Sequence, residues 1–277
     1  MASVTVGERK EILRGEEASM DEVLYQKTNA TATITINRPS RRNTLTSSVV
    51  NALRAHLART NSDPEVRVVI LTGAGDTVFC AGGDLGRDAS DSGAIARYDA
   101  NREMADLLRD IRALAKPLIA RVNGHALGSG FALVLACDLA VAVQDVRLGC
   151  PDMKVGIFPM LTLAHLNRHL GPKKALELLL TAKQITAAEA VRLGLVNDAV
   201  AREDLDLKIT ELATPILEFS PVAVRLGREA VAVSADMGFD DGLNYLLAQL
   251  TLNLQTDDAK EGAQAFLQKR KATWTGH

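Results

Sequence analysis

The order of apolar and polar positions divides the chain into short apolar runs and longer stretches with helical spacing. Short runs rich in β-branched residues predict strands, which we place at residues 23–27, 31–37, 66–72, the start of 78–85, 117–122, 139–143, 146–148 and 196–200. Apolar residues at helical spacing predict helices, at residues 47–59, 94–115, 131–136, 160–170, 173–181, 203–218, 221–235, 239–255 and 258–270. Thr46 and Thr186 stand where N-caps are expected.

The distribution of these elements predicts the fold class. Strands and helices alternate first and helices alone follow, which is typical of an α/β fold with a helical C-terminal region. We expect residues 1–20 to be a loosely ordered lead-in, residues 21–200 to form the α/β core, and residues 201–277 to form the helical region. The 277 residues, of which 47% are hydrophobic, suffice for one large domain with an appendage.

The stretch Lys116–Asp138 stands at the centre of this pattern. It predicts a buried strand, a turn of small residues and a buried helix, at residues 117–122, 123–130 and 131–136. Gly124, Gly128 and Gly130 carry no side chain, so another group can approach this backbone closely. A strand that turns through glycines into a helix points free N–H groups at one spot, which suits an anion or an oxygen that becomes one.

Composition and charge narrow the possible function classes. The formal net charge of −2 creates no field that favours nucleic acid. No 18-residue apolar run predicts a membrane span, and the first 20 residues lack the apolar stretch of a signal peptide. Cys80, Cys137 and Cys150 have no metal-binding spacing and fit a reducing compartment, with Cys137 expected in the core. We therefore expect a cytoplasmic protein without nucleic-acid or membrane partners.

Three familiar site motifs are incomplete in this sequence. Gly73–Gly75 follows a strand but lacks the third glycine and the helix of a dinucleotide site. Gly128–Gly130 lacks the spacers of a nucleophile elbow, and His125 is too close along the chain to be an obvious partner for Ser129. The five histidines include no H-E-x-x-H pair, and no metal cluster is visible. We therefore favour neither a dinucleotide site, a serine hydrolase nor a metal site.

Two glycine-rich turns remain, at residues 80–83 and 127–130. Each follows an apolar strand and precedes something helical, and either one alone fits a tight packing turn equally well. Together in one α/β domain, they can place two backbone N–H donors around one oxygen. Such a pair stabilises an oxyanion as it develops.

Blocks of residues in a fixed order resemble the enoyl-CoA hydratase/isomerase, or crotonase, superfamily over nearly everything after Asp21. The blocks are NRP at 37–39, NTL at 43–45, VFCAGGDL at 78–85, KP at 116–117, VNGHALGSG at 122–130, CD at 137–138, PD at 151–152, GIFP at 156–159, LGLVN at 193–197 and the tail at 261–274. The resemblance implies a crotonase-like spiral of ββα units, followed by C-terminal helices that assemble homotrimers or hexamers. It also implies a coenzyme A thioester as substrate, with no metal and no tightly bound cofactor.

The resemblance assigns roles to both turns. In the family, an acyl-CoA thioester carbonyl lies between two backbone N–H groups that hold the enolate, and by position these groups belong to Ala81 and Ser129. Relatives usually carry glycine where this chain has Ser129, which a backbone donor tolerates. The resemblance places the coenzyme A moiety along Arg41, Arg42, Thr44, Leu45, Cys80, Ala81, Gly83, Asp84 and Leu85. Arg41 and Arg42 can face its phosphates, and a solvated basic loop is the alternative for both.

The acidic residues depart from the family pattern. The first glutamate of the hydratases falls on Ala132, which cannot move a proton. The second falls on Asp152, which is ~1.5 Å shorter than glutamate by one C–C bond. Burial beside an apolar acyl pocket would raise the pKa of Asp152 toward working pH. We expect Asp152 to be the single acid and base, with a structural cap as the alternative, and His125 to pack where relatives often carry tyrosine.

A single carboxylate changes the expected reaction. An isomerase moves a proton between two carbons and needs one shuttle, whereas hydration needs a water held between two groups. Residues 160–163 replace a glycine-rich continuation of the hydratases, which predicts a bulkier and more apolar acyl pocket. We therefore predict an isomerase-like acyl-CoA enzyme of this family. The alternatives are a decarboxylase or thioester hydrolase of the same fold, or a non-catalytic acyl-CoA-binding or scaffold protein.

Overall fold

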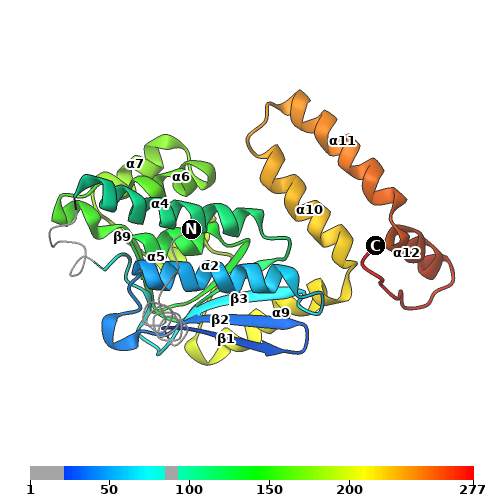
Figure 1. Ribbon diagram of the computed structural model, residues 1–277, viewed down its shortest axis with the longest axis horizontal. Helices are drawn as coiled ribbons and strands as arrows, with labels where there is room; N and C mark the ends of the chain where they lie inside the picture. Colours follow the sequence, from blue (N-terminus) through cyan, green and yellow to red (C-terminus); the bar gives the residue numbers. More distant parts are fainter. Residues whose placement is uncertain (1–21, 85–92) are drawn as a thin grey trace, which may run out of the picture.

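The computed structural model of the protein describes residues 22–84 and 93–277 (Figure 1). The predicted lead-in at residues 1–20 and the predicted binding residue Leu85 lie outside the described residues. Among those described, no helix is both long and apolar enough to cross a membrane.

The described strands form two sheets. The larger has six strands in the order β1-β2-β3-β5-β7-β10, and the smaller has four in the order β4-β6-β8-β9. The larger sheet consists of β1 (Val23–Thr28), β2 (Thr31–Ile36), β3 (Val68–Gly73), β5 (Leu118–Val122), β7 (Leu139–Val143) and β10 (Asp198–Val200). The smaller sheet consists of β4 (Val78–Cys80), β6 (His125–Leu127), β8 (Arg147–Gly149) and β9 (Gln184–Thr186).

The larger sheet follows the predicted pattern of apolar positions. The predicted hairpin is confirmed, because β1 and β2 pair in antiparallel register. In β2 the residues Ala32, Ile34 and Ile36 are fully buried and alternate with less buried threonines, as expected for a strand with one covered face. From β2 to β10 the strands are parallel. β7 is buried over Ala140–Val143, as is typical of parallel strands covered on both faces.

The predicted turn at residues 123–130 is wrong in part. Residues 125–127 form β6, which pairs in parallel with β4, and the next helix already begins at Ser129. The reason is a close approach: a Cβ on Gly124 would overlap the backbone of Thr77 and Val78. Strand β9 was not predicted, because three residues are too few to show a period.

Helices cover the sheets as the apolar spacing predicts. Those of the core are α2 (Ser47–Ser62), α4 (Ala94–Ala113), α5 (Ser129–Ala136), α6 (Met160–His169), α7 (Pro172–Leu180) and α8 (Ala187–Arg192). Both predicted N-caps are confirmed, since the side chains of Thr46 and Thr186 accept hydrogen bonds from the backbone N–H groups of Val49 and Glu189. Short 3₁₀ turns lie at η1 (Pro39–Arg41), η2 (Pro151–Val155) and η3 (Arg202–Asp204).

The C-terminal region is helical, as predicted. It contains α9 (Leu205–Glu218), α10 (Pro221–Ser234), α11 (Phe239–Gln255) and α12 (Asp257–Leu267). Helix α9 packs against β3, β5 and β7, whereas α10, α11 and α12 extend away from the sheets (Figure 1). The α/β class with a helical C-terminal region is therefore confirmed. A domain boundary near residue 201 and the trimer stay predictions.

Helix α5 is the buried centre of the core. Its residues Gly130–Leu135 are all buried. Gly130 contacts the end of β4 so closely that a Cβ there would overlap the Cys80 carbonyl oxygen and lie 2.7 Å from the Cys80 Cβ. Replacing Gly130 therefore forces β4 and α5 apart. Both glycine turns lie at this contact.

We predict that Gly130→Ala destabilises the protein by about 1–3 kcal/mol, the usual cost of overpacking a core. Gly227→Ala is the matched control, because Gly227 lies within α10 with nothing within 4 Å of its added Cβ. That change should raise stability by up to about 1 kcal/mol through helix propensity. Urea unfolding of both variants measures the difference, and equal stability of Gly130→Ala and the wild type would contradict the contact.

Candidate functional site

The two glycine turns lie against each other. Gly82 has φ +98° and Gly128 has φ +54°, conformations that side chains rarely adopt. A Cβ on Gly82 would lie 3.1 Å from the Leu127 carbonyl oxygen and 3.3 Å from the Ser129 nitrogen. The residues predicted as two halves of one site, Ala81 and Ser129, are thus brought together from segments far apart in the sequence.

Ser129 begins helix α5, and its N–H group belongs to the first turn of that helix. The first N–H groups of a helix have no partner within it and carry the positive end of its dipole. In the same turn, the N–H groups of Phe131 and Ala132 donate to the Gly128 carbonyl oxygen, each at 3.1 Å. The position of Ser129 suits a donor to a negative oxygen, although its role as such stays a prediction.

Ala81, the other predicted donor, is engaged in the described structure. Its N–H group donates to the Arg42 carbonyl oxygen at 3.1 Å. Arg42, whose carbonyl oxygen is the acceptor, and Asn43 after it both have a left-handed backbone, with φ of 54° and 53°. A substrate oxygen would have to share this N–H group or displace the Arg42 carbonyl from it.

The carboxyl group of Asp152 lies beside the second turn. Its Oδ1 and Oδ2 atoms are 3.3 and 3.4 Å from the position of a Cβ on Gly128, the residue before Ser129. The Oδ2 atom is buried without a hydrogen-bond partner among the described residues. Burial raises the pKa of Asp152, and a hydrogen bond from its own backbone N–H lowers it by less. This carboxyl group therefore favours the protonated form more than an exposed aspartate does.

The position that the family resemblance assigns to the first hydratase glutamate carries no carboxylate. Ala132 is fully buried in α5. The η2 turn that carries Asp152 has no side-chain cap at its N-terminus, which weakens the alternative of a structural cap. Thr162, to which no sequence motif assigned a role, lies with its Oγ1 3.5 Å from the Gly128 carbonyl oxygen. Its only signal in the sequence is a hydroxyl within an apolar helix.

The nearby thiols and histidines have other surroundings. Burial raises the pKa of the Cys80 and Cys150 thiols to about 12, so both stay protonated at neutral pH. His125 accepts a hydrogen bond at Nδ1 from the Arg147 backbone N–H, at 3.0 Å. Burial lowers the pKa of His165 to about 4. His165 lines a separate cavity of about 440 Å³ between α6 and α10.

Most of the predicted coenzyme A residues meet along one edge of the site. The Leu45 N–H donates to the Gly82 carbonyl oxygen at 2.8 Å, and the Asp84 N–H donates to the Leu45 carbonyl oxygen at 3.1 Å. The Thr44 hydroxyl lies 3.3 Å from Asp84 Oδ2. Gly83 forms an isolated parallel β-bridge with Leu45. The segments at residues 41–45 and 80–84 therefore run side by side, with Arg41 and Arg42 exposed at one end.

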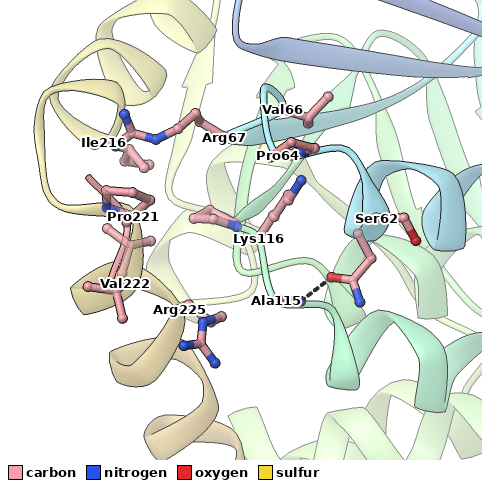
Figure 2. A pocket seen from close by; sticks show the side chains of 14 residues that line it. Ser62, Pro64, Val66, Arg67, Ala115, Lys116, Ile216, Pro221, Val222 and Arg225 are labelled. Atoms are coloured by element: carbon pink, nitrogen blue, oxygen red, sulfur yellow. Dashed lines mark hydrogen bonds between the residues drawn. The ribbon is translucent and has the colours of Figure 1, made fainter. Parts of the chain in front are cut away.

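The start of the central stretch lines a different cavity. Lys116, Arg67 and Arg225 surround a space of about 240 Å³ between the α2–β3 connection and the N-terminus of α10 (Figure 2). The Lys116 ammonium donates to the carbonyl oxygens of Thr60 and Asp63, and burial lowers the pKa of Lys116. None of the residues around this cavity belongs to the two glycine turns, so it is separate from the predicted acyl-CoA site.

Comparisons with known proteins confirm the family resemblance and the fold. A sequence profile of the family described as enoyl-CoA hydratase/isomerase matches residues 26–277. A crotonyl-CoA hydratase of Syntrophomonas wolfei is 34% identical over 262 residues, which cover 92% of this chain and 98% of that protein. A short-chain-enoyl-CoA hydratase of Clostridium acetobutylicum is 34% identical over 253 residues, covering 91% and 97%. The crystal structure of an enoyl-CoA hydratase from Bacillus anthracis is similar with a TM-score of 0.88 and 33% identity, covering 92% and 100%.

We predict that Asp152→Asn stabilises the protein at neutral pH. A carboxyl group whose pKa is raised by folding stabilises the fold only while protonated, and that contribution is lost as pH rises above the ordinary value of 3.8 and through the raised pKa. The gain in melting temperature should therefore be largest near pH 7 and vanish toward pH 3.

Asp206→Asn is a control of opposite sign, because a hydrogen bond from Arg121 lowers the pKa of Asp206. Its small destabilisation should be greatest at neutral pH and disappear in acid. Melting curves from pH 3 to 8 measure both trends. A pH-independent effect of Asp152→Asn would contradict the burial of an ionisable Asp152.

Proposed function

This chain belongs to the enoyl-CoA hydratase/isomerase family, and we propose that within this family of acyl-CoA enzymes it acts as an isomerase with a single carboxylate. The observation that carries the proposal is the Asp152 carboxyl group. It has one oxygen buried without a partner among the described residues and lies against Gly128, next to the Ser129 N–H. At the position of the first hydratase glutamate the chain has the buried methyl group of Ala132.

The first step of the proposed reaction uses both turns. The thioester carbonyl of a 3-enoyl-CoA lies between the N–H groups of Ala81 and Ser129, and the Asp152 carboxylate removes a proton from C2. The electron pair moves into the carbonyl, which forms a dienolate whose oxygen carries the charge. Two N–H donors, one at the positive end of α5, stabilise that charge.

The second step returns the proton. The Asp152 carboxyl group donates it to C4, the electron pair moves back, and the double bond lies between C2 and C3. One group both removes and returns the proton, so the balance needs no water and no second acid. The raised pKa of Asp152 makes its carboxyl group a better base when ionised and keeps proton return feasible near neutral pH.

Hydration is the weaker assignment for this chain, although its relatives include proteins named as hydratases. Adding water across C2 and C3 requires a water held and activated while C2 receives a proton. At the position of the first glutamate the chain has Ala132, whose methyl group can neither transfer a proton nor accept a hydrogen bond. The shared fold and sequence support an acyl-CoA substrate, and the single carboxylate favours proton transfer within it.

The coenzyme A moiety is proposed to bind along residues 41–45 and 80–84. These segments are joined by backbone hydrogen bonds beside the first turn, so a bound thioester can reach Ala81 from this edge. Arg41 and Arg42 are exposed and offer charge-assisted contacts to phosphate groups. No metal or tightly bound cofactor enters the proposed reaction.

A homotrimer, alone or paired into a hexamer, is proposed as the working assembly. In α11 only Gly242 is buried, while apolar side chains repeat on the exposed surface at helical spacing. These are Phe239, Leu243, Leu247, Leu250 and Leu254, each more than half exposed. A continuous apolar stripe of this kind is unfavourable in water, and a second copy of the chain can cover it.

The decisive variant for the reaction is Asp152→Asn. Isomerisation of 3-enoyl-CoA to 2-enoyl-CoA should fall by about 10²–10⁴-fold in kcat, the usual contribution of a general acid–base group. Binding of acyl-CoA should change little. Asp106→Asn is the matched control, because Asp106 lies in α4 and pairs with exposed Arg109; its activity should equal that of the wild type.

Three results would overturn the proposal. Full isomerase activity in Asp152→Asn would remove the single-carboxylate mechanism, and rapid conversion of 2-enoyl-CoA to 3-hydroxyacyl-CoA by the wild type would make the chain a hydratase despite Ala132. Failure to bind any acyl-CoA would leave a scaffold function instead.

Light scattering tests the assembly. The wild type should have three or six times the chain mass of 29.7 kDa. Leu247→Glu places a charge on the exposed stripe of α11 and should shift the mass toward one chain, whereas Gln249→Glu on the same helix should not. A monomeric wild type would contradict the proposed assembly.

A further inference from the structure

Two asparagine side chains, to which no substrate contact has been assigned, are buried beside the proposed site. Asn43 is 0% exposed and Asn123 is 2% exposed. Asn43 lies within residues 41–45 of the proposed coenzyme A edge, and Asn123 lies between β5 and β6. Buried amides are costly unless each polar atom is paired, so the partners of these two show what they hold.

Asn123 uses every hydrogen-bonding atom of its amide. Its Nδ2 donates to the carbonyl oxygens of Gly73 and Gly75, at 2.8 and 2.7 Å. Its Oδ1 accepts from the Gly73 N–H at 3.2 Å and lies 3.0 Å from the Thr72 hydroxyl. This amide therefore holds the end of β3 and the beginning of the loop that follows it.

Asn43 holds the same loop at its other end. Its Nδ2 donates to the carbonyl oxygens of Ala74 and Val78, at 2.9 and 2.7 Å. Its Oδ1 accepts from the Arg38 N–H at 2.9 Å. Residue 43 also follows Arg42, whose carbonyl oxygen accepts from the Ala81 N–H. Asn43 thus connects the coenzyme A edge, the β3–β4 loop and the first proposed donor.

The two amides meet at Gly73. Asn123 bonds both the N–H and the carbonyl oxygen of Gly73, and a Cβ on Gly73 would lie 2.8 Å from the Asn43 Nδ2. From this point the loop runs to Thr77, β4 follows over Val78–Cys80, and Ala81 comes directly after it. Because β4 is a strand of three residues, a shift of the loop is carried directly to the Ala81 N–H.

We propose that Asn43 and Asn123 are positioning residues that clamp the β3–β4 loop and thereby set the spacing between the Ala81 and Ser129 N–H groups. This inference rests on the proposed function, in which both groups bind the thioester oxygen. Asn123 approaches from the segment that carries Ser129, and Asn43 approaches from the segment that carries the coenzyme A edge. Together they connect three separate stretches of chain, whose relative positions determine where the thioester oxygen binds.

The chemistry of the contacts requires an amide at both positions. Each Nδ2 faces two carbonyl oxygens, while each Oδ1 faces backbone N–H, so a rotated amide would set donors against donors. An aspartate has the same shape but no N–H groups, and its charge would repel the carbonyl oxygens. Asn→Asp therefore loosens the clamp while it keeps the packing volume.

The test compares Asn43→Gly, Asn123→Asp and a matched control. Glycine adopts the left-handed backbone of residue 43, so this change removes the amide without straining the chain. Asn61→Asp is the control, because Asn61 is an exposed asparagine whose Oδ1 accepts from the Ala115 N–H far along α2, and aspartate keeps that acceptor. Thr72→Val is a milder change that removes the hydroxyl beside Asn123 Oδ1 and, with it, that hydroxyl's hydrogen bond of 2.9 Å to the Arg121 carbonyl oxygen.

Two readouts separate positioning from a role in stability alone. The first is the infrared C=O stretch of crotonyl-CoA labelled with ¹³C at its carbonyl, which moves to lower frequency when N–H donors polarise the bond. The second is the split between kcat and KM for 3-enoyl-CoA. Asn43→Gly and Asn123→Asp should lose at least half of the frequency shift and about tenfold to a hundredfold in kcat, as expected for a misplacement of about 1 Å. The KM of both variants should remain near the wild-type value. Asn61→Asp should match the wild type in frequency shift, kcat and KM.

Each outcome decides the inference. Folded variants with the full frequency shift and full kcat would overturn it and leave the proposed function intact. A wild type without any shift on binding would overturn the proposed oxyanion site and the clamp with it. Should Asn123→Asp fail to fold, Thr72→Val has to show a smaller loss of both shift and kcat, and wild-type values there would overturn the role of Asn123.

Discussion

The contact between Gly130 and the end of β4 organises this protein. Two backbones approach there so closely that a methyl group would overlap the Cys80 carbonyl oxygen. Because a packed core leaves neither backbone room to move away, β4, α5 and the two glycine turns next to them are held at one separation. Ser129 and Ala81 are the chain neighbours of Gly130 and Cys80, and the Asp152 carboxyl group lies beside Gly128, so the proposed chemistry depends on this contact.

Electrostatics at the site follow from the same packing. Burial raises the pKa of Asp152, and its Oδ2 atom is buried without a hydrogen-bond partner among residues 22–84 and 93–277, which is unfavourable for stability alone. Groups kept in such surroundings are often functional. The arginines at residues 41 and 42 are exposed, in contrast to the buried Asp152 Oδ2 atom, which fits the proposal that these arginines face the phosphates of coenzyme A.

The sequence predicted the parts that repeat a pattern and missed those that depend on pairing between distant segments. The alternation in β2 and the long helices follow from local periods. The two threonine caps follow from the residue types that begin helices. Strands β6 and β9 are too short to show one, and β6 exists because Gly124 allows contact with β4. The engagement of the Ala81 N–H by Arg42 and the roles of Asn43 and Asn123 arise from loops that meet only in three dimensions. The family resemblance predicted Asp152 as the candidate carboxylate and Ala132 in place of the first glutamate, whereas the burial of the Asp152 Oδ2 atom without a hydrogen-bond partner among the described residues required the structure.

The measurement that tests this account most directly is a crystal structure with a non-reactive acyl-CoA analogue that keeps the thioester carbonyl. We predict that the carbonyl oxygen lies about 3 Å from the nitrogen atoms of both Ala81 and Ser129, with the Ala81 N–H shared with or released from Arg42. The Asp152 carboxyl group should face C2 of the acyl chain. A carbonyl oxygen bound away from both nitrogen atoms, with Asp152 directed away from the acyl chain, would contradict the account.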